Sequence, residues 1–106
     1  MSNIVVVAIF KLREGAEEAA IEALTPVIDG THGEAGCLSY ALHRGAHDPL
    51  TLVIVERWTS MVALESHMQQ PYVAALGAKA GDLVSEPPII QILEPIPLGD
   101  PIKGTL

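Results

Sequence analysis

The chain has 106 residues, of which 49% are hydrophobic and only 4% aromatic, and its formal net charge at pH 7 is −7. This length is enough for one domain with its own core but not for two. The acidic balance excludes non-specific nucleic-acid binding, because phosphate backbones attract clustered Lys and Arg, and the six basic residues here are scattered along the chain.

The longest uninterrupted apolar run, Ile4 to Phe10, is far shorter than the roughly 20 residues that a membrane helix needs. No basic segment followed by an apolar one opens the chain, so we expect no signal peptide. Cys37 is the only cysteine, which excludes an internal disulfide and provides no thiolate set for zinc. We therefore expect a cytoplasmic protein that does not bind membranes, with Cys37 as a small buried hydrophobe.

The first third of the chain predicts a strand followed by a helix. Residues 3–13 are rich in β-branched side chains and nearly continuously apolar, which is typical of a strand buried on both faces. After a turn at Glu14-Gly15, apolar residues recur at three- and four-residue steps from Ala16 and predict an amphipathic helix. We expect Pro26 to kink this helix or to end its first segment. The run from 30 to 36 is interpreted as a connector.

The rest of the chain predicts two strands, a helical region and a last strand. Residues 36–45 alternate, with Leu38, Tyr40 and Leu42 on one side, and residues 50–58 are apolar on both sides until Glu56. A helix is expected from about Ser60, its N-cap, and a second helical segment after Pro71. Residues 88–94 form the last strand, so we predict a domain over residues 1–94 and an extended arm over residues 95–106.

This order of strands and helices predicts an α+β fold of the ferredoxin-like βαββαβ type, an antiparallel sheet with both helical regions on one face. The strands are apolar on both sides, so about seven aliphatic side chains remain on the uncovered face. At about 1.5–3 kcal/mol each, leaving them exposed forgoes at most roughly 10–20 kcal/mol, whereas a whole protein has about 5–15 kcal/mol of stability. We therefore expect a homodimer that pairs this face with its copy.

Several segments together resemble the antibiotic biosynthesis monooxygenase family of dimeric α+β barrels. They are Gly36-Cys37-Leu38-Ser39-Tyr40, the strand end Glu56-Arg57-Trp58, and Ala63-Leu64 followed by His67 and Pro71-Tyr72. The likeness spans roughly residues 3–94 and agrees with the predicted order of elements. It implies a dimeric barrel, and for some members an oxidation of phenols or quinols with dioxygen and no cofactor.

Other members of the family degrade haem or isomerise a phosphorylated sugar. The haem-degrading members use an Asn, a Trp and a His, and the positions that match them here are Ala8, His67 and Gly77. None of the three agrees, so the resemblance does not imply haem degradation. The sequence also has no cluster of Lys and Arg for a phosphorylated substrate, which weakens the isomerase interpretation.

His67 is the first candidate for catalysis. It follows Ala63 and Leu64 by four and three residues, so a titratable imidazole lies on an apolar helix face. A neutral imidazole in an apolar pocket can take a proton from a phenol, which is the minimum equipment for oxygenation without a cofactor. The alternative is a core histidine that is hydrogen-bonded to a neighbour.

Glu56 is the second candidate, because a carboxylate can orient His67 or a substrate hydroxyl. It could equally pair with an arginine such as Arg44 or be solvated. Trp58, Tyr72 and Tyr40 are expected to line the pocket as flat walls for an aromatic substrate, although Trp58 could also be plain core.

The leading hypothesis is a homodimeric, cofactor-independent monooxygenase that oxidises a small aromatic quinol or polyketide-like phenol with dioxygen. No metal site is expected, because the four histidines lack ligand spacing, and no glycine-rich nucleotide or flavin motif occurs. The alternative is a non-catalytic dimer that binds an aromatic ligand or is associated with stress, or an isomerase of the same family.

Overall fold

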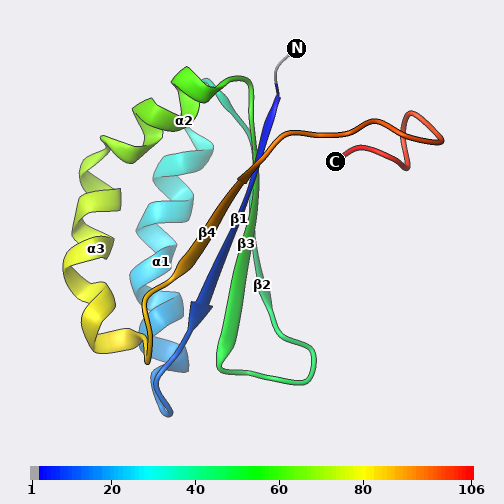
Figure 1. Cartoon of the computed structure of the whole chain (residues 1–106). Coiled ribbons are helices and arrows are strands. Elements are labelled where there is room, and N and C mark those ends of the chain that lie inside the picture. Colours follow the sequence, from blue (N-terminus) through cyan, green and yellow to red (C-terminus); the bar gives the residue numbers. More distant parts are fainter. Residues whose placement is uncertain (1–2) are drawn as a thin grey trace.

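A four-stranded antiparallel sheet carries all the helices on one face in this computed structural model, which describes residues 3–106 (Figure 1). The elements are β1 (Ile4–Lys11), α1 (Glu17–His32), β2 (Cys37–Arg44), β3 (Thr51–Trp58), α2 (Met61–Met68), α3 (Pro71–Leu83) and β4 (Ile89–Leu93). The strand order β2-β3-β1-β4 is that of the ferredoxin-like fold. The predicted fold class is confirmed.

The core lies between the sheet and the helices. Alternate residues of β1 and β3 face the helices, because successive side chains of a strand point to opposite faces. Ile54 and Trp58 of β3 are almost completely buried there against Leu24 and Val27 of α1 and Leu64 of α2. With one Trp and one Phe in the chain, packing in this core is mainly aliphatic.

Helix α1 differs from the prediction in two ways. It runs unbroken through Pro26, whose exposed position on the outer side costs one helical hydrogen bond without interrupting the buried stripe. It also continues to His32, so the predicted connector is shorter than expected. At Gly30 in this helix, an added Cβ would lie 2.5 Å from the ring of Tyr72. The ring of Tyr72 therefore packs against the last turns of α1.

The two helical segments after β3 follow the prediction closely. The hydroxyl of Ser60 accepts a hydrogen bond from the backbone N–H of Ala63 at 3.1 Å, which confirms Ser60 as the N-cap of α2. Pro71 ends this region and opens α3 at a position where its missing N–H has no helical partner to lose.

Strand β2 corrects the predicted alternation. The register with β3 shifts between Cys37 and Ser39, so Leu38 is an extra residue in a bulge and its side chain is 43% exposed. Tyr40 is buried and Leu42 half-buried on the helix-facing side as expected. A bulge moves side chains from one face to the other, which alternation in a sequence does not reveal.

Among residues 3–106, no helix covers the other face of the sheet (Figure 1). Seven aliphatic side chains point to this open face: Val5, Val7, Ile9, Val53, Val55, Ile89 and Leu93. After β4 the chain continues as an arm, residues 95–106, which projects on the side away from the helices (Figure 1). The arm is not extended throughout, because a turn closes between Asp100 and Gly104. Within residues 3–106, no helix combines the length and apolar character that crossing a bilayer requires.

Candidate functional site

A pocket of about 370 Å³ lies between the helix-facing side of the sheet and helices α2 and α3. Its volume is within the range of small-molecule sites. Most of its lining is aliphatic and comes from β1, β4, α2 and α3, and the titratable side chains among its lining residues are Tyr40, Glu56, Glu65 and His67. This pocket brings together three of the five residues that the sequence predicted, namely His67, Glu56 and Tyr40.

His67 lies in the last turn of α2, with only 3% of its surface exposed, and lines the pocket. Its Nδ1 is 2.9 Å from Oε2 of Glu34. A carboxylate oxygen can only accept a hydrogen bond, so we assign the imidazole proton to Nδ1. In the neutral ring this leaves Nε2 with its lone pair, ready to take a proton.

Glu34 is the residue that the sequence prediction missed. Its Oε2 accepts a hydrogen bond from the hydroxyl of Tyr72 as well as the one from His67. It lies in the connector just before β2, and the antiparallel pairing of Cys37 with Trp58 brings that connector close to the start of α2. This register is the signal that could have located Glu34, since nothing in its local sequence distinguishes it from the other surface carboxylates.

Tyr72 belongs to the first turn of α3 and is directed to Glu34 instead of the pocket. Burial raises the pKa of Tyr72 to about 12, and the hydrogen bond and charge of Glu34 act in the same direction. The hydroxyl therefore stays protonated at neutral pH and remains a donor. Tyr72 is not among the residues that line the pocket, where the sequence analysis expected it.

Glu56 is 5% exposed and also lines the pocket. Its Oε1 accepts a hydrogen bond from Nε1 of Trp58 at 2.9 Å, so Trp58, and not His67 or Arg44, is its hydrogen-bond partner here. Burial raises the pKa of Glu56 to about 7; the Trp58 hydrogen bond opposes this rise, and the charge of Glu34 adds to it. Near neutral pH, both protonation states of this carboxyl group are populated.

Trp58 is completely buried and is not among the residues that line the pocket, which agrees with its interpretation as plain core. The indole packs beneath the imidazole instead, with ring centroids 4.7 Å apart and an interplanar angle of 43°. Tyr40 does line the pocket, and its ring centroid is 5.4 Å from that of His67. Burial raises the pKa of Tyr40, with the charges of Glu56 and Glu34 adding to the effect, so Tyr40 is a neutral wall.

The arrangement is equipped for proton transfer. Across the part of the chain that the structure describes, no three His, Cys, Asp or Glu side chains gather as a set that could hold a metal ion. Instead, one pocket contains an imidazole that is oriented by a carboxylate and a second carboxyl group with a pKa near 7. Such a pair can take a proton from one substrate atom and give a proton to another.

Fold and site define a small α+β protein with a ligand-sized, mostly apolar pocket and proton-transfer groups at one end of it. The chain belongs to the antibiotic biosynthesis monooxygenase family, which it matches over residues 3–79. The family resemblance seen in the sequence is confirmed.

Relatives in both sequence and structure agree with this membership. The chain is 35% identical over 95 residues to the Mycobacterium tuberculosis protein named "Putative monooxygenase Rv0793", covering 90% of this chain and 93% of that protein. The structure of Rv0793 superposes with a TM-score of 0.83 at 34% identity, covering 93% of this chain and 98% of Rv0793. A Caulobacter crescentus protein described as a "putative antibiotic biosynthesis monooxygenase" has a TM-score of 0.84 at 27% identity, covering 90% and 91% of the two chains.

Proposed function

We propose that the protein is a monooxygenase that oxidises a small aromatic quinol or polyketide-like phenol with dioxygen and requires neither a metal nor an organic cofactor. The observation that carries this proposal is the imidazole of His67, held at Nδ1 by Glu34 and exposed to an apolar pocket. Family membership and the name of the relative Rv0793 support the same class of reaction.

In the proposed reaction, Nε2 of His67 takes the proton of a substrate hydroxyl and leaves a phenolate. The electron-rich ring passes one electron to dioxygen, and the two radicals join at a ring carbon that carries hydrogen. Loss of water from the resulting hydroperoxide gives a quinone, so one oxygen atom enters the product and the other leaves as water. The substrate itself supplies all the electrons, so the balance needs no external reductant.

Glu56 acts in this proposal as the proton donor to the departing hydroxide. Its pKa of about 7 keeps part of the population protonated at neutral pH, and its hydrogen bond to Trp58 holds it at the pocket. The orienting role that the sequence suggested for Glu56 passes to Glu34, because Glu34 makes the contact with His67. Tyr40 and the aliphatic walls position the ring.

We also propose that the protein is a cytoplasmic homodimer in which two copies bury their open faces against each other. The dimer is supported by the seven aliphatic side chains of the open face, which have no helix over them within residues 3–106. The unpaired Cys37 supports a reducing compartment.

Oxygen consumption with a panel of hydroquinones, anthrones and naphthols tests the proposal. We expect uptake with at least one of them and incorporation of one labelled atom from ¹⁸O₂ into the product, read by mass spectrometry. His67→Ala should lower the rate by about 10²–10⁴-fold, the usual contribution of a general base. The matched control is His43→Ala, which removes an exposed histidine of β2 that does not line the pocket.

Two results would contradict the proposal: no uptake by the intact protein across the panel, or equal rates in the His67→Ala and His43→Ala proteins. Saturable binding of an aromatic compound without product would favour the binding-only alternative. The isomerase alternative has no support in the pocket, because no Lys or Arg is among its lining residues to hold a phosphate.

A further inference from the structure

The strand register places Glu56 at one end of the pocket. In the pairing of β1 with β3, Val6 lies opposite Glu56, and Phe10 lies opposite Leu52. Val6 and Phe10 both line the pocket, and four residues of strand span roughly 13 Å. Glu56 therefore marks one end of a long cavity, and the far end at Phe10 has aliphatic walls.

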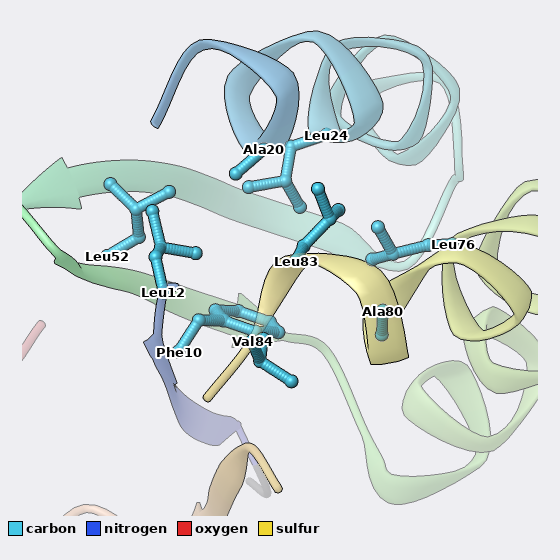
Figure 2. A pocket seen from close by; sticks show the side chains of 9 residues that line it. All are labelled: Phe10, Leu12, Ala20, Leu24, Leu52, Leu76, Ala80, Leu83 and Val84. Atoms are coloured by element: carbon cyan, nitrogen blue, oxygen red, sulfur yellow. The ribbon is translucent and has the colours of Figure 1, made fainter. Parts of the chain in front are cut away.

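A second hollow of about 20 Å³ lies next to the far end of the pocket, deep between β1, β3, α1 and α3 (Figure 2). Phe10, Leu76 and Ala80 line both spaces, so these three side chains form the partition between them. The hollow is lined only by apolar residues, and such a space stays dry because a water molecule in it would have no hydrogen-bond partners.

We propose that the far end of the pocket binds an aliphatic chain carried by the substrate, so that the ligand is an alkyl-substituted phenol or hydroquinone. This inference rests on the proposed function for the identity of the ring. The hydroxylated ring lies at His67 and Glu56, and the chain runs along β1 past Ala8 toward Phe10 and Ala80. A ring without the chain would leave the aliphatic length of the pocket filled with water, which apolar walls disfavour.

Binding measured without oxygen separates this inference from the chemistry. Unbranched alkyl hydroquinones, with chains from none to about eight carbons to match the roughly 13 Å of strand, are titrated anaerobically into the full-length protein. The signal is the fluorescence of Trp58, the only tryptophan, whose ring packs against His67. We expect Kd to fall about fourfold with each added methylene until the cavity is full, and then to level off.

Variants at the partition should move the point at which Kd levels off. Ala80→Leu fills the far end and should bring the levelling to a shorter chain, whereas Phe10→Leu opens the way to the inner hollow and should move it to a longer chain. Ala78→Leu is the matched control, because it adds the same side chain to an exposed position of α3 that does not line the pocket. Ala78→Leu should bind unsubstituted hydroquinone with the same Kd as the parent protein.

A Kd that does not change with chain length would overturn the inference, as would identical series for Ala80→Leu and Ala78→Leu. If Ala80→Leu does not fold, Phe10→Leu provides the test. Levelling of its Kd at a longer chain than in the parent protein would support the inference, and levelling at the same chain length would overturn it. A chain-length dependence without any oxygen uptake would leave the binding site standing and overturn the proposed oxygenase. Oxygen uptake together with a Kd that does not change with chain length would support the proposed oxygenase and overturn the inference about the aliphatic chain.

Discussion

Glu34 connects three parts of the molecule through a single carboxyl group. One of its oxygens accepts from His67 in α2 and from Tyr72 in α3, while its backbone belongs to the connector that leads into β2. Two donors on one oxygen fix the direction of the imidazole as well as its tautomer. In the proposed reaction, the carboxylate therefore decides which ring nitrogen takes the substrate proton.

We predict that Glu34→Gln lowers the oxidation rate by about 10- to 100-fold, with little change in KM. The amide makes a neutral hydrogen bond in place of a charge-assisted one, a loss of about 1.5–3 kcal/mol for the imidazolium formed in the reaction. Steady-state kinetics gives the rate, and ¹⁵N NMR of the His67 ring shows the change in tautomer population. Tyr72→Phe is the control, because it removes the other hydrogen bond and keeps the charge; an equal loss there would contradict this role of Glu34.

The raised pKa of Glu56 predicts that the free energy of unfolding falls as the pH rises. Its pKa is about 7 in the folded chain against an ordinary value of 4.5. Between these two values the folded state binds more protons than the unfolded state, so the free energy of unfolding decreases with increasing pH and levels off above pH 7. The full difference amounts to about 3 kcal/mol. We expect Glu56→Gln, which still accepts from Trp58, to remove this dependence.

Urea unfolding of both proteins from pH 4.5 to 8 checks this prediction. The measured quantity is the difference between the two free energies of unfolding, since the other titrating groups are common to both proteins. A difference that stays constant over this range would show that Glu56 is ionised at its ordinary pKa.

Single side chains were predictable from the sequence where their element fixed their direction. The apolar helix face around His67 places the imidazole inward, and the structure has it buried in the pocket. Glu34 and His67 are 33 residues apart, and their contact depends on how β2, β3 and α2 meet. No periodicity within one element contains that information. Trp58 and Glu56 lie two residues apart on β3, so their shared face follows from the sequence, whereas the hydrogen bond between them does not.

At the level of elements, the contact of α1 with α3 depends on a glycine. Gly30 leaves room for the ring of Tyr72, which in turn reaches Glu34. A helix interior normally favours Ala over Gly by about 1 kcal/mol. Here the missing methyl group allows two helices to approach and positions the residue that holds the imidazole.

We predict that Gly30→Ala destabilises the protein by about 1–3 kcal/mol, because the new methyl group would lie 2.5 Å from the Tyr72 ring and force it away. Gly81→Ala is the control. It is also helical, but nothing lies within 4 Å of its added methyl group, so it should be neutral or stabilising by up to about 1 kcal/mol. Thermal unfolding of the two variants gives the comparison, and a stabilised Gly30→Ala protein would contradict the packing.

The elements themselves followed from hydrophobic patterning, and their departures have local causes. Strands and helices appear in the predicted order because apolar periodicity and the breaks at Ser60 and Pro71 mark them. The bulge at Leu38 and the passage of α1 through Pro26 do not follow from such patterns. Both depend on tertiary packing, which outweighs the local preference for alternation or for a helix break.

For the whole molecule, the open face of the sheet is the feature with the largest consequence. Val7, Ile9, Val53 and Val55 lie at its centre on the two inner strands and are only half-buried. The arm adds Ile96, Leu98, Ile102 and Leu106, which are 66–86% exposed. An apolar surface that spreads over a sheet and a projecting arm is typical of a protein that associates with its own copy.

We predict that the protein sediments as a dimer and that Val55→Lys converts it to a monomer. A lysine at the centre of the open face would bring its ammonium group into an apolar interface, where an unpaired charge costs more than a few kcal/mol of binding free energy. Ala75→Lys is the control, because it places the same side chain on an exposed part of α3 outside the pocket. Sedimentation equilibrium over a range of concentrations gives the mass. A monomeric parent protein, or a Val55→Lys protein that stays dimeric, would show that this face is not the interface.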